Sequence, residues 1–130
     1  MVPGRRPSAA REEVLEELER FVRILNESGA VVVVEGESDR RALVESGVSV
    51  RVLTLAEFER EVEDMPGQEV ELLTDLDRQG EEHFRRLVGR YGGVVRFTTQ
   101  ARDYLRSTTS YRMGMRSVYE LLLFYRRNAL

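Results

Sequence analysis

The segment that decides the fold of this chain is Val31-Val32-Val33-Val34-Glu35-Gly36-Glu37-Ser38-Asp39. Four consecutive β-branched apolar residues are too few for a helix and do not alternate with polar residues. This pattern favours a strand that is buried on both faces of a parallel sheet. Glu35 and Gly36 then break the strand, because charged residues and glycine are typical of turns. We therefore expect a central strand at residues 31–34 with acidic groups at its carboxyl end.

Helical and strand patterns alternate on both sides of this segment. We expect strands at residues 31–34, 48–53, 69–73 and 94–97, and amphipathic helices at residues 11–27, 39–46, 55–65, 84–91 and 118–125. Residues 74–80 are expected to form a polar turn, and residues 98–110 a short helix and a polar loop. Short connections between alternating elements predict an α/β, Rossmann-like fold, with a four-stranded, mostly parallel sheet and helices on both faces. We expect one compact domain with an amino-terminal helix at 1–29, a core at 30–98 and a basic helical extension at 99–130.

The composition excludes several kinds of site. The 130 residues include no cysteine and one histidine, His83, which excludes disulfides, zinc fingers, thiol catalysis and metal centres built from several histidines. A metal would have to be held by carboxylates. No apolar run has the length of a membrane span and no secretory signal is visible, so we expect a cytoplasmic protein with no membrane partner.

The net charge of −3 is unevenly distributed along the chain. Residues 101–130 contain six arginines and two acids, whereas residues 11–100 contain 12 arginines and 21 acids. Arginines and aromatic rings in the carboxyl-terminal segment could bind a nucleic-acid strand, or they could belong to an amphipathic helix with a buried apolar face. That helix could also form a homodimer or a contact within a larger complex.

Acidic residues follow two of the expected strands. Glu35 comes directly after the first strand, and Asp75 and Asp77 come after the third. In a parallel sheet the carboxyl ends of strands share one edge, so these three residues converge if the two strands are neighbours. Carboxylates without cysteine or several histidines suit a hard ion such as Mg²⁺, which is commonly held together with phosphate oxygens. The alternative is that these acids only cap turns and helices.

Together, Val31–Asp39 and the later segment Leu72-Leu73-Thr74-Asp75-Leu76-Asp77-Arg78-Gln79-Gly80 resemble the two signatures of the Toprim domain. This domain occurs in topoisomerases, bacterial-type primases, OLD-family nucleases, recombination mediators and ribonucleases that mature ribosomal RNA. The resemblance covers about residues 30–98. At 130 residues the chain is similar to the small stand-alone Toprim proteins found mainly in archaea.

The resemblance implies specific roles for residues of both signatures. Glu35 is expected to be the general acid or base and a metal ligand, and Asp75 and Asp77 the principal Mg²⁺ ligands, with Mn²⁺ as a substitute. Arg78 could contact a phosphate. Residues with expected secondary roles are Asp39, Gly36 and Gly80. Gln79 stands where topoisomerases often have a third acid.

These features lead to two hypotheses of function. The first is a Mg²⁺-dependent enzyme that cleaves nucleic-acid phosphodiester bonds, of the ribosomal RNA maturation type. The second is a non-catalytic Toprim adaptor that binds nucleic acid or protein in DNA repair, replication or RNA processing. Outside these roles, we expect His83 to be an ordinary surface or half-buried helical residue.

Overall fold

The computed structural model describes the backbone of residues 5–128 and the side chains of residues 11–128. Within these residues the chain forms a four-stranded sheet with the strand order β2-β1-β3-β4, and every neighbouring pair is parallel. The strands are β1 (Val31–Val34), β2 (Val52–Thr54), β3 (Glu69–Leu73) and β4 (Arg96–Thr98). The predicted α/β class is confirmed, and the sheet is wholly parallel.

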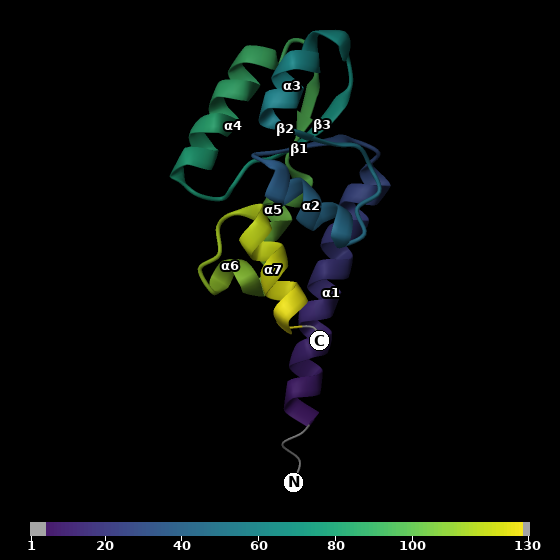
Figure 1. Ribbon diagram of the computed structural model, residues 1–130, viewed down its shortest axis with the longest axis vertical. Helices are drawn as coiled ribbons and strands as arrows, with labels where there is room; N and C mark the ends of the chain where they lie inside the picture. Colours follow the sequence, from purple (N-terminus) through teal and green to yellow (C-terminus); the bar gives the residue numbers. More distant parts are fainter. Residues whose placement is uncertain (1–4, 129–130) are drawn as a thin grey trace.

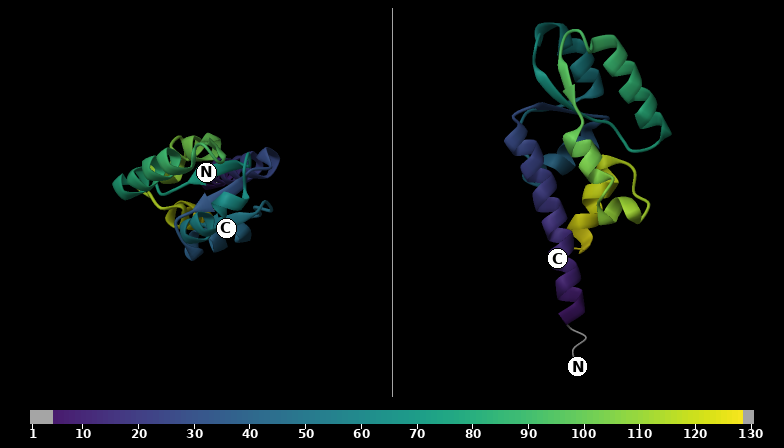
Figure 2. Two further views of the ribbon diagram at one scale, coloured as in Figure 1. Left: turned by 90° about the horizontal axis from the view of Figure 1, so that it is seen from above. Right: turned by 180° about the vertical axis from the view of Figure 1, so that it is seen from behind.

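Helices cover both faces of this sheet (Figure 1). One face packs against α3 (Leu55–Glu61), the 3-10 turn η2 (Val62–Asp64) and α4 (Arg78–Tyr91). The other face packs against α1 (Arg5–Ser28), α2 (Glu37–Glu45), α5 (Gln100–Leu105) and α7 (Val118–Asn128), with the short α6 (Thr109–Arg112) beside them. Figure 2 shows α1 lying along the carboxyl-terminal helices, with its first turns extending beyond the rest of the protein. No helix in the described part of the chain has both the length and the apolar character needed to cross a membrane.

The central strand separates two hydrophobic cores. Val32 and Val34 pack into the core beneath α1, α2, α5 and α7, while Val31 and Val33 pack into the core beneath α3 and α4. All four side chains are buried, as expected for a strand covered on both faces. Each such burial contributes about 1.5 to 3 kcal/mol. Residues from α5 and α7 belong to the first core, so the segment after residue 98 is part of the same compact domain.

Several predicted boundaries were wrong. The second strand begins at Val52 rather than residue 48, because the Val48 N–H closes the end of α2 by donating to the Leu43 carbonyl at 3.0 Å. The fourth strand begins at Arg96, since the N–H groups of residues 94 and 95 donate to the Tyr91 carbonyl in a turn after α4. The predicted polar turn at 74–80 is shorter, because α4 begins at Arg78.

Candidate carboxylate site

The site lies at the carboxyl edge of the sheet, where β1 and β3 lie side by side. The chain leaves β1 toward β2 on one side, and the later strands β3 and β4 lie on the other side. Such a reversal of strand order leaves a crevice beyond the carboxyl ends, which is where open α/β sheets bind ligands. Val34 is paired with Leu73, so the residues that follow each strand begin at the same level. The condition for convergence, that the first and third strands are neighbours, is therefore met.

Glu35 and Asp75 meet directly at this edge. The Asp75 backbone N–H donates a hydrogen bond to Oε2 of Glu35 at 3.2 Å. The Glu35 side chain is 18% exposed, so solvent reaches it only in part. This contact fixes the carboxylate of one strand end against the backbone of the other.

Asp75 carries a perturbed carboxyl group at the centre of the site. Its Oδ1 accepts a hydrogen bond from the Val118 N–H at 3.2 Å. Burial raises the pKa of the Asp75 carboxyl to about 7, and the negative charges of neighbouring carboxylates act in the same direction. Those neighbours are Asp39, Glu35 and Asp77. The edge of the sheet therefore concentrates negative charge in a partly desolvated position.

Asp39 reaches the same site from the first turn of α2. Its Oδ2 accepts the Gly36 N–H at 3.1 Å and its Oδ1 accepts the Tyr119 N–H at 2.8 Å. Burial raises the pKa of Asp39, and the charge of Glu35 adds to this effect. Gly36 is thus the residue before α2 whose backbone orients Asp39. Asp39 therefore lies both at the start of a helix and within the acidic cluster.

Asp77 is exposed and begins α4. Its Oδ1 accepts the Gly80 N–H at 2.7 Å, so Asp77 is the N-cap residue of the helix. A Cβ atom at position 80 would lie 1.9 Å from the Asp75 carbonyl oxygen, so glycine is required for the helix to approach the Asp75 loop this closely. Gly80 therefore shapes the site through its missing side chain.

Arg78 does not contact the carboxylates in this structure. Its side chain is 96% exposed, and its ion pair with Glu82 is long, at 3.9 Å. The predicted contact of Arg78 with a phosphate would therefore be made by a side chain that is almost fully exposed to solvent.

His83, for which the sequence predicted no role in the site, completes the cluster. Nδ1 of His83 lies 3.0 Å from Oε1 of Glu35, and the His83 side chain is 26% exposed. His83 is half-buried, as expected, but its contact with Glu35 was missed. The sequence would have given a signal only with the helix begun at Arg78, because Gly80, His83 and Leu87 then occupy one face of it.

A buried arginine supports the loop between β3 and α4. The Arg102 guanidinium donates to the Thr74 carbonyl at 2.9 Å and to the Asp75 carbonyl at 2.7 Å. It also pairs with Glu81 at 2.8 Å and lies over the Phe84 ring. Arg102 is 3% exposed and is a structural part of the site rather than a free cation.

Mg²⁺ requires oxygen ligands, and the carboxylates at this edge of the sheet are ligands of that kind. In the described part of the chain, no group of three or more carboxylate or histidine side chains is placed so that it could hold a metal ion. Mg²⁺ is commonly held by one or two carboxylates together with water and phosphate oxygens. Oδ2 of Asp75 and Oδ2 of Asp77 have no hydrogen bond to residues 11–128, and Asp75 lies among like charges. These residues fit an open site of that kind.

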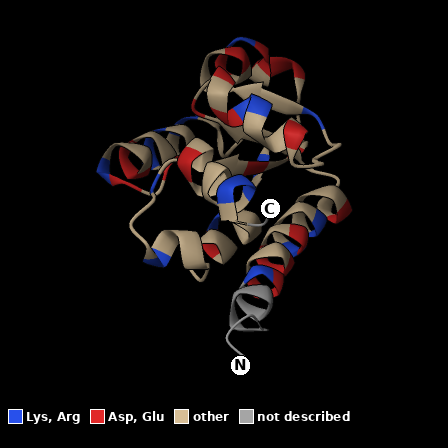
Figure 3. Cartoon of the chain, turned by 60° about the horizontal axis from the view of Figure 1, so that its bottom comes forward, with Lys and Arg blue, Asp and Glu red and all other residues tan. Residues whose placement is uncertain are grey.

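The carboxyl-terminal arginines are largely bonded within the fold. Arg106 pairs with Glu81, Arg126 pairs with Glu45, and Arg116 lies over the Tyr111 ring at 3.9 Å. Most rings of this segment pack on the core, including the buried Tyr125. In the view of Figure 3, acidic and basic residues are interspersed along the helices. This arrangement favours the amphipathic-helix alternative for most of the segment.

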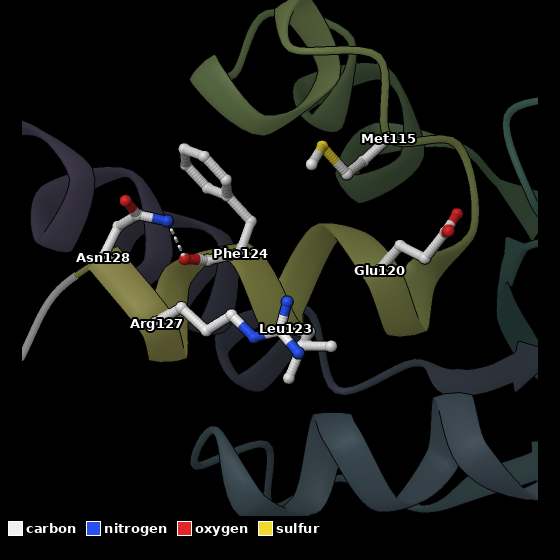
Figure 4. Close-up of a pocket in the computed structure, with 6 residues that line it drawn as sticks. All are labelled: Met115, Glu120, Leu123, Phe124, Arg127 and Asn128. Atoms are coloured by element: carbon white, nitrogen blue, oxygen red, sulfur yellow. Dashed lines mark hydrogen bonds between the residues drawn. The ribbon is translucent and has the colours of Figure 1, made fainter.

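A separate hollow of 250 Å³ lies beside α7, away from the carboxylates (Figure 4). Its apolar walls come from Met115, Leu123 and Phe124, and its polar walls from Glu120, Arg127 and Asn128. The predicted homodimer or complex through the carboxyl-terminal helix would use this surface of α7. That contact stays a prediction.

Comparisons with known proteins support the fold. A solved structure of a protein from Aquifex aeolicus matches with a TM-score of 0.63 and 23% sequence identity, covering 78% of this chain and 95% of that one. No protein-family model matches the sequence, and no curated protein matches it significantly. At this level of identity, the likeness to the solved structure concerns the fold alone.

Proposed function

We propose that this protein is a Toprim-type, Mg²⁺-dependent enzyme that cleaves phosphodiester bonds in nucleic acid. The observation that carries the proposal is the contact of Glu35 with Asp75 where β1 and β3 end side by side, with Asp39 and Asp77 near enough for their charges to act on the Asp75 carboxyl. A partly buried cluster of like charges is costly to the fold, and a divalent cation would relieve that cost. The two segments that supply these residues are the ones that resemble the Toprim signatures.

Asp75 and Asp77 would hold Mg²⁺ through the carboxylate oxygens that are left without hydrogen bonds. Bound there, Mg²⁺ would polarise the phosphate and lower the pKa of a water molecule. An acidic edge also needs such a cation before it can approach a polyanion.

Glu35 would move a proton in the reaction. Each carboxylate oxygen can accept more than one hydrogen bond, so Oε1 can receive a proton from water while its contact with His83 persists. The Asp75 N–H and His83 hold the two oxygens in position. Arg78, on its exposed arm, can move to a phosphate oxygen and bind it through two parallel hydrogen bonds.

The test is cleavage of end-labelled RNA and DNA in Mg²⁺ or Mn²⁺ by the wild type and by the double variant Asp75→Asn, Asp77→Asn. We expect cleavage by the wild type and a loss of at least about a hundredfold in the variant. The matched control is Glu63→Gln, Asp64→Asn, which removes two exposed acids of η2 that take no part in the carboxylate cluster. Equal cleavage by the double variant and this control contradicts the proposal.

Calorimetric titration with Mg²⁺ separates the metal site from the chemistry. We expect heat of binding in the wild type and in the control, and none in the variant that lacks Asp75 and Asp77. Binding of nucleic acid without turnover at any metal concentration would favour the non-catalytic adaptor instead.

A further inference from the structure

A second polar hollow adjoins the carboxylate site on the side of α2. It has a volume of 300 Å³ and lies between α2 and α7. Its walls are formed by Ser38, Arg41, Ala42, Glu45, Tyr119 and Arg126. Pockets of about this size are at the lower end of the range for small ligands. One nucleotide of a longer chain is an occupant of suitable size.

Asp39 joins this hollow to the carboxylate site. Ser38 precedes Asp39 in α2, and the Tyr119 N–H donates to Oδ1 of Asp39 at 2.8 Å. Asp39 in turn lies close enough to Asp75 to raise the pKa of that carboxyl. A nucleic-acid strand whose phosphate sits at Asp75 can therefore place an adjoining nucleotide in the hollow.

The walls of the hollow have the chemistry that binds a nucleotide. Tyr119 is 41% exposed, in contrast to Tyr125 of the same helix, which is 1% exposed. Arg41 is exposed and takes part in no ion pair with residues 11–128, whereas Arg126 is paired with Glu45 at 2.7 Å. Two arginines and one glutamate leave one positive charge in the hollow. An exposed ring next to an unpaired guanidinium can bind a base by stacking and its phosphate by charge.

We propose that this hollow is a nucleotide subsite that binds an unpaired base next to the cleaved phosphate, with Tyr119 stacking on the base and Arg41 contacting its phosphate. The inference rests on the proposed function, and it adds the substrate class. Stacking on a side chain requires a free base face, which a paired and stacked duplex does not offer. The preferred substrate is therefore single-stranded at the cleavage site.

The experiment measures fluorescence anisotropy of labelled oligouridine, oligothymidine and a duplex of equal length, in buffer with Ca²⁺ in place of Mg²⁺, because the acidic edge needs a divalent cation before it can approach a polyanion. The variants are Tyr119→Ala, Tyr119→Phe and Arg41→Gln. The control is Arg60→Gln, which removes an exposed arginine of α3 on the other face of the sheet. Thermal unfolding of each variant shows whether it is folded.

We expect the wild type to bind single strands at least about fivefold more tightly than duplex. Tyr119→Ala should weaken single-strand binding about tenfold, and Tyr119→Phe should retain it because the ring is kept. Arg41→Gln should weaken binding several-fold. It should also reduce by about one the number of counterions released on binding, which is measured from the salt dependence of the binding constant. Arg60→Gln should bind as the wild type does.

The outcomes distinguish this subsite from the proposed enzyme. Cleavage by the wild type together with wild-type binding by Tyr119→Ala and Arg41→Gln overturns the subsite and leaves the enzyme standing. Preference for duplex overturns it as well. Weaker binding by both variants in a protein that cleaves nothing supports the subsite and contradicts the enzyme. A wild type that binds none of the three probes overturns both.

Discussion

Nδ1 of His83, on α4, lies 3.0 Å from Oε1 of Glu35, at the end of β1, although 48 residues separate them in the sequence. The other oxygen of Glu35 accepts the Asp75 N–H. The carboxylate is thus held from both sides, by a side chain of one element and the backbone of another. If Glu35 moves the proton in catalysis, His83 is a positioning residue.

Removing this contact should lower turnover more than substrate binding. We expect His83→Ala to reduce kcat about tenfold with little change in KM, because Glu35 loses its fixed orientation. His83→Asn should restore part of the activity, since its amide can occupy the place of Nδ1. Steady-state kinetics on a labelled oligonucleotide measure both constants. Arg85→Gln, an exposed change on the same helix, is the control, and an unchanged kcat in His83→Ala would refute the positioning role.

The buried guanidinium of Arg102 should matter for stability. Arg102→Met keeps the bulk of the side chain but leaves the Thr74 and Asp75 carbonyls and Glu81 without this donor. We expect the free energy of unfolding to fall by about 2 to 4 kcal/mol in urea denaturation.

Arg106→Gln is the matched comparison for this change. Arg106 pairs with the same Glu81, but its side chain is 39% exposed, so its loss should cost less than about 1 kcal/mol. Equal losses in the two variants would show that burial of Arg102 adds nothing.

The sequence was sufficient to predict the class of fold and the position of acids after two strands, whereas the meeting of those strand ends depended on the order of the strands. Four valines in a row require burial on both faces, which in turn requires helices on both sides of a parallel sheet. The acids at residues 35 and 75 follow directly from the strand ends, so their placement needed only the order of the strands. The orientation of Asp77 was harder to predict from the sequence, because its role as a helix cap depended on α4 beginning at Arg78 rather than later.

Contacts made by the carboxyl-terminal segment could not be predicted. Three residues reach the site from α5 and α7, namely Arg102, Val118 and Tyr119. Helices have no hydrogen-bonded register with the strands, so their position against the edge of the sheet could not be predicted. Burial of an arginine is unusual, and nothing in the local sequence separates Arg102 from its exposed neighbours. Long-range packing decides both features.

Stability should fall as the pH rises through the range in which Glu71 titrates. Glu71 lies in β3, is 1% exposed and accepts the N–H groups of Ala101 and Arg102. Burial raises its pKa from 4.5 to about 7. The folded state therefore binds this proton more tightly than the unfolded chain, and the resulting stability is present below about pH 4.5 and is lost as the pH rises to about 7.

Urea denaturation at several pH values tests this linkage. We expect the free energy of unfolding to decrease by about 2 to 3 kcal/mol across that range because of Glu71 alone. Glu71→Gln should remove this part of the slope. Asp75, whose pKa is also raised to about 7, contributes in the same direction, and Asp75→Asn measures its share separately. A Glu71→Gln protein with the wild-type slope would exclude Glu71 as the source.

Two glycines of α4 should respond in opposite ways to alanine. At position 80 the new Cβ would lie 1.9 Å from the Asp75 carbonyl oxygen, so the helix and the Asp75 loop must separate. We expect Gly80→Ala to lower the free energy of unfolding by about 1 to 3 kcal/mol and to weaken Mg²⁺ binding. At position 89 no atom lies within 4 Å of the new Cβ, so Gly89→Ala should stabilise the helix by about 0.5 to 1 kcal/mol and leave Mg²⁺ binding unchanged. Thermal unfolding with calorimetry measures both effects, and a Gly80→Ala protein as stable as Gly89→Ala would show that the close approach of α4 to Asp75 is not required.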